Sequence, residues 1–156
     1  MAKKYWLMKT EPTTFSYDDL EESPKKTTSW EGVRNYQARN LMRDEIKKGD
    51  AVIIYHSSTD EPAAVGMAEV VREAYPDANA MDPKHKYFDP KSKAKGSNPW
   101  LMVDVKAMGK FKAPVTRDRM RQSPALRNAM VLQKGSRLSV QPLSSDEFKT
   151  IVKLGS

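Results

Sequence analysis

The sequence predicts a mixed α+β domain built on a curved, barrel-like sheet with short helices at its sides. Three observations favour this class: about five or six strand-like segments stand beside about four helical ones, the strand spacing is irregular, and strict strand–helix–strand alternation is missing. The 156 residues have the usual size of one domain with one core, without repeats or low-complexity tracts. We therefore expect a single domain over residues 1–156.

The first elements are a short strand and a helical turn. Residues 4–9 combine aromatic and aliphatic side chains and predict a strand. Glu11 is expected to leave this strand in extended form, because the residue before a proline disfavours the helical region. Ser16 followed by Asp19 has the spacing of a capping box, which predicts the start of a helical turn.

A longer helix and a buried strand follow. Asn35 is a good N-cap, and the apolar residues after it recur at helical spacing. Gly49 is expected to end this helix. Residues 51–57 form a short apolar run with β-branched residues in the middle, which predicts a central buried strand.

The second half of the chain contains more strands and a long connection. Residues 63–75 fit a helix or a strand, and we favour a strand because Gly66 disfavours a helix and suits a bulge. Residues 76–99 predict a long loop, which inside a compact domain is usually functional or mobile. The remaining predicted elements are a strand over 100–111, short helices over 116–123 and 124–130, a strand over 137–143 and a final helix capped by Ser144 and Glu147.

The net charge of +7, with an isoelectric point near 9.5, favours an anionic partner, of which nucleic acid is the commonest. Ordinary solubility is the alternative explanation. The charge is segregated along the chain, because residues 84–96 and 106–122 are basic and residues 17–23 are acidic. The two basic segments would make one basic face if the fold brought them together.

Several classes of protein are disfavoured. The chain has no cysteine, no signal-peptide pattern and no apolar run near the roughly 20 residues of a membrane-spanning helix. We expect no disulfide, no membrane partner and a cytoplasmic location. Two histidines, His56 and His85, are poor prospects for a zinc site, so we expect no metal. The common nucleotide-binding and hydrolase motifs are missing, so we expect no cofactor and no catalytic residue.

Residues 30–40, WEGVRNYQARN, gather flat rings and hydrogen-bonding side chains just before the longer helix. Trp30 and Tyr36 suit stacking on a base, and Arg34 suits a phosphate group or a base face. Asn35 offers the donor and the acceptor that reading a base edge requires. Each residue also has a structural interpretation, as a cap, a core residue or a solvated charge, but the set together favours a pocket.

Two further features stay open. His56 stands beside Ser57 at a strand end, and neighbouring strand residues point to opposite faces, so His56 is not expected to activate Ser57 directly. We expect a structural or a ligand-facing role for it. Tyr87 and Phe88, within the basic loop, would either stack on a base or pack against the core.

Several segments resemble the EVE domain family of the PUA-like superfamily, in particular its stand-alone bacterial members. They follow each other in family order over nearly the whole chain, and KTEP, GVRNYQARN and YHS together are highly specific. The segments are YWLMKTEP (5–12), FSYDDL (15–20), WEGVRNYQARN (30–40), GDAVIIYHS (49–57), AYPD (74–77), YFDP (87–90) and RLSVQPL (137–143). The resemblance implies a curved sheet of pseudo-barrel form and a pocket that in the family is associated with modified bases, modified cytosines in DNA among them.

The resemblance implies a non-enzymatic module that holds a flipped, modified base of DNA or RNA in an aromatic and polar pocket. The implied pocket residues are Lys9, Thr10, Glu11, Trp30, Val33, Arg34, Asn35, Tyr36, Tyr55, His56 and Ser57. The expected phosphate contacts are Arg34, Arg39, Lys84, Lys86, Lys91, Lys93 and Lys95. We expect a monomer whose partner is nucleic acid, with a separate effector protein as a second candidate partner.

Two other interpretations remain. A small hydrolase acting on a modified nucleoside or base would use Lys9, Glu11 and Ser57, because a Lys and a Glu close together in a half-buried pocket can have shifted pKa values. A protein-interaction domain would show no preference for any modification and little dependence on salt.

Overall fold

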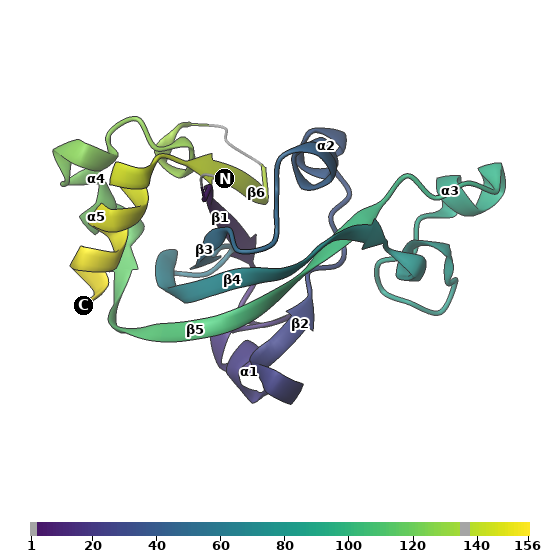
Figure 1. Cartoon of the computed structure of the whole chain (residues 1–156), viewed down its shortest axis with the longest axis horizontal. Helices are drawn as coiled ribbons and strands as arrows, with labels where there is room; N and C mark the ends of the chain where they lie inside the picture. The colour runs from purple at the N-terminus through teal and green to yellow at the C-terminus, as the bar shows by residue number, and fades with distance from the viewer. Residues whose placement is uncertain (1–2, 135–137) are drawn as a thin grey trace.

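A computed structural model of the chain describes residues 3–134 and 138–156. Its framework is one curved, six-stranded mixed sheet with short helices around it, which confirms the predicted fold class (Figure 1). The strands are β1 (Tyr5–Thr10), β2 (Thr27–Ser29), β3 (Ala51–His56), β4 (Ala63–Pro76), β5 (Leu101–Thr116) and β6 (Val140–Leu143). The α-helices are α1 (Tyr17–Glu22), α2 (Tyr36–Asp44), α3 (Pro90–Lys95), α4 (Arg117–Arg121) and α5 (Ser145–Gly155).

The strand order across the sheet is β2-β5-β4-β3-β1-β6. Strand β1 pairs in parallel with β3, whereas the pairs β1–β6, β2–β5, β3–β4 and β4–β5 are antiparallel. The parallel pair needs a long crossover, and α1, β2 and α2 supply it. This pairing brings the ends of β1 and β3 to the same edge, where the site described below is found.

The sheet is buried on both faces. Alternation along β1 sends Trp6 and Met8 into one apolar cluster and Leu7 into another. The first cluster includes side chains of α1 and α2, and the second includes Ile151 of α5. Each fully buried side chain of this size contributes about 1.5–3 kcal/mol relative to an exposed one.

Two capping boxes predicted from the sequence are confirmed. Ser16 accepts a hydrogen bond from the backbone of Asp19, whose carboxylate accepts one from Ser16 N–H in return, and α1 begins there. Ser144 and Glu147 make the same reciprocal pair at the start of α5. These ends were predictable because a capping box is a local pattern.

The helix after Asn35 begins as predicted but ends earlier. The Asn35 side-chain oxygen accepts a hydrogen bond from Ala38 N–H at 3.0 Å, as an N-cap does. Helix α2 ends at Asp44 rather than at Gly49. Gly49 has a φ of +95° and its N–H donates to Val70 O, so it serves the turn that enters the sheet.

Strand β4 has the predicted irregularity at Gly66, where the register of its pairing with β5 shifts. The ring of Tyr17 lies against Gly66, and a Cβ atom there would lie 2.6 Å from the ring. The Tyr17 hydroxyl donates to Met67 O and accepts from Gly109 N–H, so α1 is bonded to both strands at this point. Gly66 therefore allows a close contact as well as a bulge.

The prediction of a loop over residues 76–99 was wrong in part. This segment contains a 3₁₀ turn, η2 (Ala78–Met81), which is capped by Asp77, and helix α3, which is capped by Asp89. Residues 124–130 contain the 3₁₀ turn η3 (Pro124–Leu126) rather than an α-helix, and η4 (Met130–Leu132) follows. Helical periodicity cannot identify elements this short.

Other elements also differ from prediction. Strand β5 runs on to Thr116, where α4 begins. The short turn η1 (Pro24–Lys26) and strand β2 were not predicted, because neither carries an apolar pattern. The predicted last strand is observed as β6, and its first predicted residue, Arg137, lies outside the described residues.

The two basic segments of the sequence are not brought together. Helix α3, in the first segment, lies at one end of the long axis of the molecule, and α4, in the second, lies near the other end (Figure 1). These two helices therefore do not form the single basic face that the sequence suggested. Helix α3 precedes the long strand β5 and α4 follows it, so the length of β5 keeps the two helices apart.

In the described part of the chain, no helix is long and apolar enough to cross a membrane.

Candidate functional site

A cavity of about 500 Å³ opens at the edge of the sheet where β1, β2 and β3 end. Its lining mixes three aromatic rings with many hydroxyl groups and a few charges. The lining residues are Lys9, Thr10, Glu11, Thr14, Phe15, Thr28, Ser29, Trp30, Glu31, Gly32, Val33, Ser57, Ser58, Lys86, Tyr87 and Ser139. We refer to it as the main cavity.

The parallel pairing of β1 with β3 builds one wall of the main cavity. Thr10 is opposite His56 in the register, and Ser57 N–H donates to Thr10 O at 2.9 Å, which carries the pairing one step beyond the strands. The side chains that follow each strand, Glu11 and Ser57, consequently reach the same edge. The hydroxyl of Thr10 donates to Phe15 O at 2.7 Å and fixes the turn after β1.

The second wall continues β2. Trp30 N–H donates to Val103 O at 2.7 Å, so the chain stays paired with β5 as it leaves the strand. Trp30 is almost buried, at 7% exposed, and Phe15 meets its ring edge-on with the centroids 6.5 Å apart. Both rings belong to the lining of the main cavity.

The third wall comes from the segment before α3. The ring of Tyr87 lies over Gly32, where a Cβ atom would come within 2.8 Å of it. Gly32 also has a φ of +80°, a conformation that other residues adopt only with strain. Burial raises the pKa of Tyr87, and Glu31 and Glu11 raise it further, so its hydroxyl remains protonated at neutral pH.

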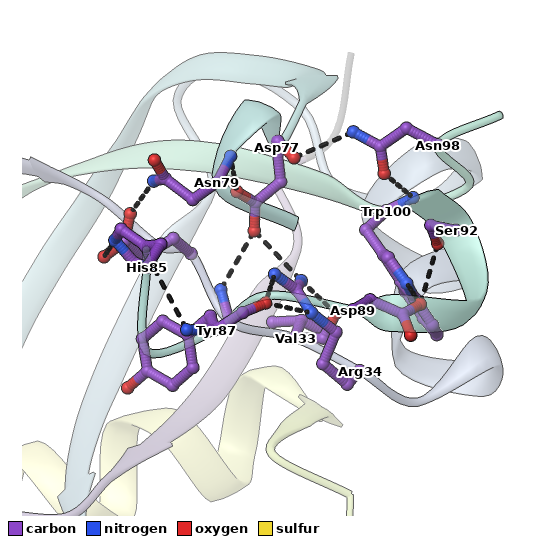
Figure 2. Close-up of polar contacts among 12 residues, drawn as sticks. Val33, Arg34, Asp77, Asn79, His85, Tyr87, Asp89, Ser92, Asn98 and Trp100 are labelled. Carbon is purple, nitrogen blue, oxygen red and sulfur yellow. Dashed lines mark hydrogen bonds and ion pairs between the residues drawn. The ribbon is translucent and has the colours of Figure 1, made fainter. Parts of the chain in front are cut away.

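Asp77 ties the second and third walls together (Figure 2). Its side chain is fully buried, and one oxygen accepts hydrogen bonds from Gly32 N–H at 3.1 Å and from the Arg34 guanidinium at 3.0 Å. Its other oxygen accepts from Asn79 N–H. The same guanidinium donates from Nε and Nη2 to Tyr87 O, so the position of Tyr87 depends on Asp77 through Arg34.

A second set of contacts holds the same loop. The Asn79 amide donates to Glu31, and His85 Nε2 lies 3.6 Å from the other Glu31 oxygen. His85 Nδ1 accepts a hydrogen bond from Tyr87 N–H. Residues that are far apart in the chain are thus connected at the rim of the main cavity (Figure 2).

The structure brings some of the predicted pocket residues together and separates others. Those that line the main cavity are Lys9, Thr10, Glu11, Trp30, Val33 and Ser57. Those outside its lining are Arg34, Asn35, Tyr36, Tyr55 and His56. The structure thus does not bring these five into the main cavity, and the reason differs from residue to residue.

Arg34, Asn35 and Tyr36 make other contacts within the protein. Arg34 is engaged with Asp77 and Tyr87 O, and the Asn35 oxygen caps α2. Tyr36 is 55% exposed and packs on Trp100, with the ring centroids 4.7 Å apart. It lines a second cavity of about 430 Å³ instead.

Tyr55 and His56 diverge because they are neighbours on a strand. Tyr55 points into the cluster beneath α5 and lines a third, smaller cavity. His56 Nε2 accepts a hydrogen bond from Tyr17 N–H at 3.1 Å, at the start of α1. His56 thus has the structural role that the sequence left open beside a ligand-facing one.

We expect His56 to make the stability of the protein depend on pH. Burial lowers the pKa of His56 from its ordinary value of 6.5, while Asp18 raises it by a smaller amount and Lys110 lowers it slightly further. The unfolded chain then binds more protons between these two pKa values, so the free energy of unfolding falls as the pH drops below about 6.5 through the folded pKa. Protonated Nε2 could no longer accept from Tyr17 N–H.

Urea denaturation from pH 7.5 down to pH 5, on the wild type and His56→Gln, checks this expectation. The wild type should lose more stability over this range than the variant. Equal losses in both proteins would assign the pH dependence to other groups.

The residues predicted to contact phosphate are divided among different surfaces. Lys86 lines the main cavity, and Arg34, Lys91 and Lys95 line the second cavity. Arg39 lies over the ring of Tyr36 and donates to Pro99 O. Lys84 and Lys93 are exposed on the same part of the chain. Contact of these side chains with phosphate stays a prediction.

Several lining residues were not among those predicted. Tyr87 had been left undecided between stacking and core packing, and it does line the main cavity, whereas Phe88 lines the second. Gly32 also belongs to the lining, and the Tyr87 ring lies against it. The others are Thr14, Phe15, Thr28, Ser29, Glu31, Ser58 and Ser139. The hydroxyl residues among them have no sequence signal that distinguishes them from ordinary surface positions.

The chemistry of the main cavity is that of a polar, ring-lined binding site. Burial lowers the pKa of Lys9, and the charge of Arg117 lowers it further. Lys9, Glu11 and Ser57, the set considered for hydrolysis, line the same cavity. Within residues 3–134 and 138–156, no group of three or more His, Cys, Asp or Glu side chains is arranged to hold a metal ion.

Comparisons of the sequence and of the structure with known proteins lead to the same family. The profile of the EVE domain family matches residues 4–154. Human thymocyte nuclear protein 1 is 38% identical over 167 aligned residues, covering 96% of this chain and 73% of that protein. A Pseudomonas syringae protein of known structure superposes with a TM-score of 0.90 at 40% identity, covering 97% of this chain and 99% of that one. A structure of human THYN1 protein in complex with 5-methylcytosine-containing DNA also gives 0.90, at 37% identity over 99% and 98% of the two chains.

Proposed function

Because the chain belongs to the EVE domain family, we propose that it binds nucleic acid and recognises a modified base, such as a modified cytosine, without acting on it as an enzyme. The main cavity would hold the base after it has left its stack. DNA and RNA are both candidate targets. The human THYN1 protein, which is similar over 99% of this chain, forms a complex with DNA that contains 5-methylcytosine.

The observation that carries the proposal is the composition of the main cavity. It has about 500 Å³, within the usual range of small-ligand pockets, and three of its lining residues are aromatic. A protein that contacts only phosphate does not sense a mark on a base, whereas a cavity that encloses the base does. In the main cavity, the rings can enclose a base and the hydroxyl groups can hydrogen-bond to its edge.

We assign roles to the lining residues on this basis. Tyr87 would stack on the base, with the edge of Trp30 closing the far side. Ser29, Ser57 and Glu11 would hydrogen-bond to its edge, since hydroxyls both donate and accept and a carboxylate accepts. Lys86 at the cavity would attract the backbone.

Direct binding measurements test the proposal. The probes are matched single- and double-stranded DNA and RNA oligonucleotides that contain cytosine, 5-methylcytosine or 5-hydroxymethylcytosine, each at two salt concentrations. We expect tighter binding of one modified form, with a preference over cytosine that survives the higher salt, because contacts to the base release few counterions. Equal, salt-sensitive binding of all forms would contradict base recognition.

A hydrolase acting on a modified nucleoside or base is the second candidate function. It is favoured by one observation: Lys9, Glu11 and Ser57 line the same cavity, and burial lowers the pKa of Lys9. This candidate predicts product release from a modified nucleoside, measured by chromatography, and loss of that turnover in Glu11→Gln. The proposed reader predicts binding without turnover in both proteins.

A further inference from the structure

The third cavity lies beside the main cavity and is strongly basic. It has a volume of about 210 Å³, and four of its lining residues are cationic. These four come from β1, from α4 and from the chain after η4, which are far apart in the sequence. The lining residues are Lys9, Tyr55, Ser57, Ser58, Pro62, Arg117, Arg121, Val131, Gln133 and Lys134.

The arginines of this cavity are directed by the fold. Arg117 and Arg121 are four residues apart on α4, so they lie on one face of it. Thr116 caps that helix, and Arg117 N–H donates to Pro62 O at 2.8 Å, which fixes α4 against the start of β4. Arg119, between them on the same helix, is not part of the lining, and all three arginines are exposed.

Negative charge near this cavity is sparse. No Asp or Glu belongs to the lining among the described residues. Asp118 lies 3.8 Å from Arg121, but its side chain is 88% exposed, so the pair is weakly held in solvent. Burial lowers the pKa of Lys9, and Arg117 is close enough to lower it further. Burial raises the pKa of Tyr55, with Arg117 and Arg121 opposing that rise and Asp118 adding to it. Cationic groups thus converge on a small concave space with too little acid to balance them.

The third cavity adjoins the main cavity. Lys9, Ser57 and Ser58 line both. A nucleotide whose base entered the main cavity would therefore carry its own backbone close to the third one. Arginine guanidinium groups match phosphate oxygens with paired hydrogen bonds, and hydroxyls such as those of Ser57 and Ser58 add further donors.

We propose that the third cavity is a phosphate-binding subsite, in which Arg117, Arg121 and Lys134 hold a backbone phosphate next to the base in the main cavity. This inference rests on the proposed function. It assigns a phosphate contact to residues 116–123, which overlap the second basic segment of the sequence but were not among the expected phosphate contacts. It also gives the protein a way to set the direction in which the strand enters the main cavity.

The test compares two double variants that each remove two positive charges. Arg117→Ala with Arg121→Ala removes the subsite, and Arg119→Ala with Arg127→Ala removes exposed arginines that line neither cavity. The probe is an oligonucleotide with one 5-methylcytosine, titrated at three salt concentrations beside its unmodified form. A third variant, Arg117→Lys with Arg121→Lys, keeps the charges, and thermal melting checks that each variant is folded.

We expect the subsite variant to bind the modified oligonucleotide about tenfold more weakly than the control variant, which is the effect of losing one strong charge-assisted contact. The slope of log affinity against log salt should decrease by about 0.7 to 0.9, corresponding to one phosphate. The Lys variant should recover most of this slope. The ratio of affinities for modified and unmodified forms should not change.

A second arm identifies the phosphate. Oligonucleotides with a single neutral methylphosphonate linkage on either side of the 5-methylcytosine are measured with the same proteins. One of these linkages should weaken binding to the wild type and have no further effect on the subsite variant. If every linkage affects both proteins equally, the phosphate is not held here.

The two proposals fail in different ways. Equal affinity of the subsite variant and the control, with the preference for 5-methylcytosine retained, would overturn the phosphate subsite and leave the proposed function standing. If only the subsite variant loses affinity, and the wild type shows no preference for a modified base, the phosphate subsite would be supported and recognition of the base would be contradicted. Neither effect in any protein would overturn both.

Discussion

Replacing Tyr87 with alanine is expected to weaken binding of a 5-methylcytosine oligonucleotide by about tenfold to a hundredfold, the range that loss of one stacked ring produces. Tyr87 lines the main cavity, and its ring rests on the backbone of Gly32. The ring is therefore held in place by the protein before any ligand arrives. Fluorescence anisotropy at one fixed salt concentration measures the change.

Tyr87→Phe is the matched control for this prediction. It keeps the ring and its contact with Gly32 but removes the hydroxyl. If stacking is the role of Tyr87, the Phe variant should bind within about threefold of the wild type. A loss in Tyr87→Phe as large as in Tyr87→Ala would instead show that the hydroxyl contacts the base. If Tyr87→Ala and Tyr87→Phe both bind as tightly as the wild type, Tyr87 does not contact the bound base.

Replacing Asp77 with alanine is expected to lower the free energy of unfolding by about 3 kcal/mol, because it leaves a guanidinium and two backbone N–H groups without their buried acceptor. The three donors are those of Arg34, Gly32 and Asn79. Since Arg34 also holds Tyr87 O, the third wall of the main cavity should lose its position. Binding should therefore weaken in this variant even below its melting temperature.

Urea denaturation and the binding assay together check this expectation. Asp82→Ala is the control, because Asp82 is exposed in the same loop and its carboxylate accepts only from Lys84 N–H among the contacts described. That variant should change the free energy of unfolding by no more than about 0.5 kcal/mol. A loss below about 1 kcal/mol in Asp77→Ala would mean that water replaces the carboxylate at little cost and that the loop is held by other contacts.

Local patterns in the sequence predicted much of the fold. The capping boxes of α1 and α5, the Asn35 cap and the buried strand β3 were recognised because each depends on residues within a few positions. The misjudged segments were those without such a pattern. Helix α3 and turn η2 are short elements that begin after the caps Asp89 and Asp77, and β2 is three polar residues that pair with β5.

The candidate site divides in the same way. Lys9, Glu11 and Ser57, which the resemblance implied, lie at or just after strand ends, and the parallel pairing of β1 with β3 brings those ends together. Tyr36 and Asn35 lie outside the lining of the main cavity, because Tyr36 packs on Trp100 and the Asn35 oxygen caps α2, and the sequence does not show these contacts. Arg34 was expected to bind a ligand, whereas its guanidinium bonds Asp77 and Tyr87 O within the protein.

The sequence alone determined the family, the sheet-based class, the main helix starts and the segments from which the first two walls of the cavity come. Tertiary structure alone decided the third wall, where Tyr87 reaches Gly32, and the small basic cavity formed by β1, α4 and the chain after η4. The physical reason is range. A cap or an apolar run is stabilised by neighbours in the chain, but Asp77 meets Arg34 across 43 positions because a buried carboxylate must find donors wherever the fold provides them.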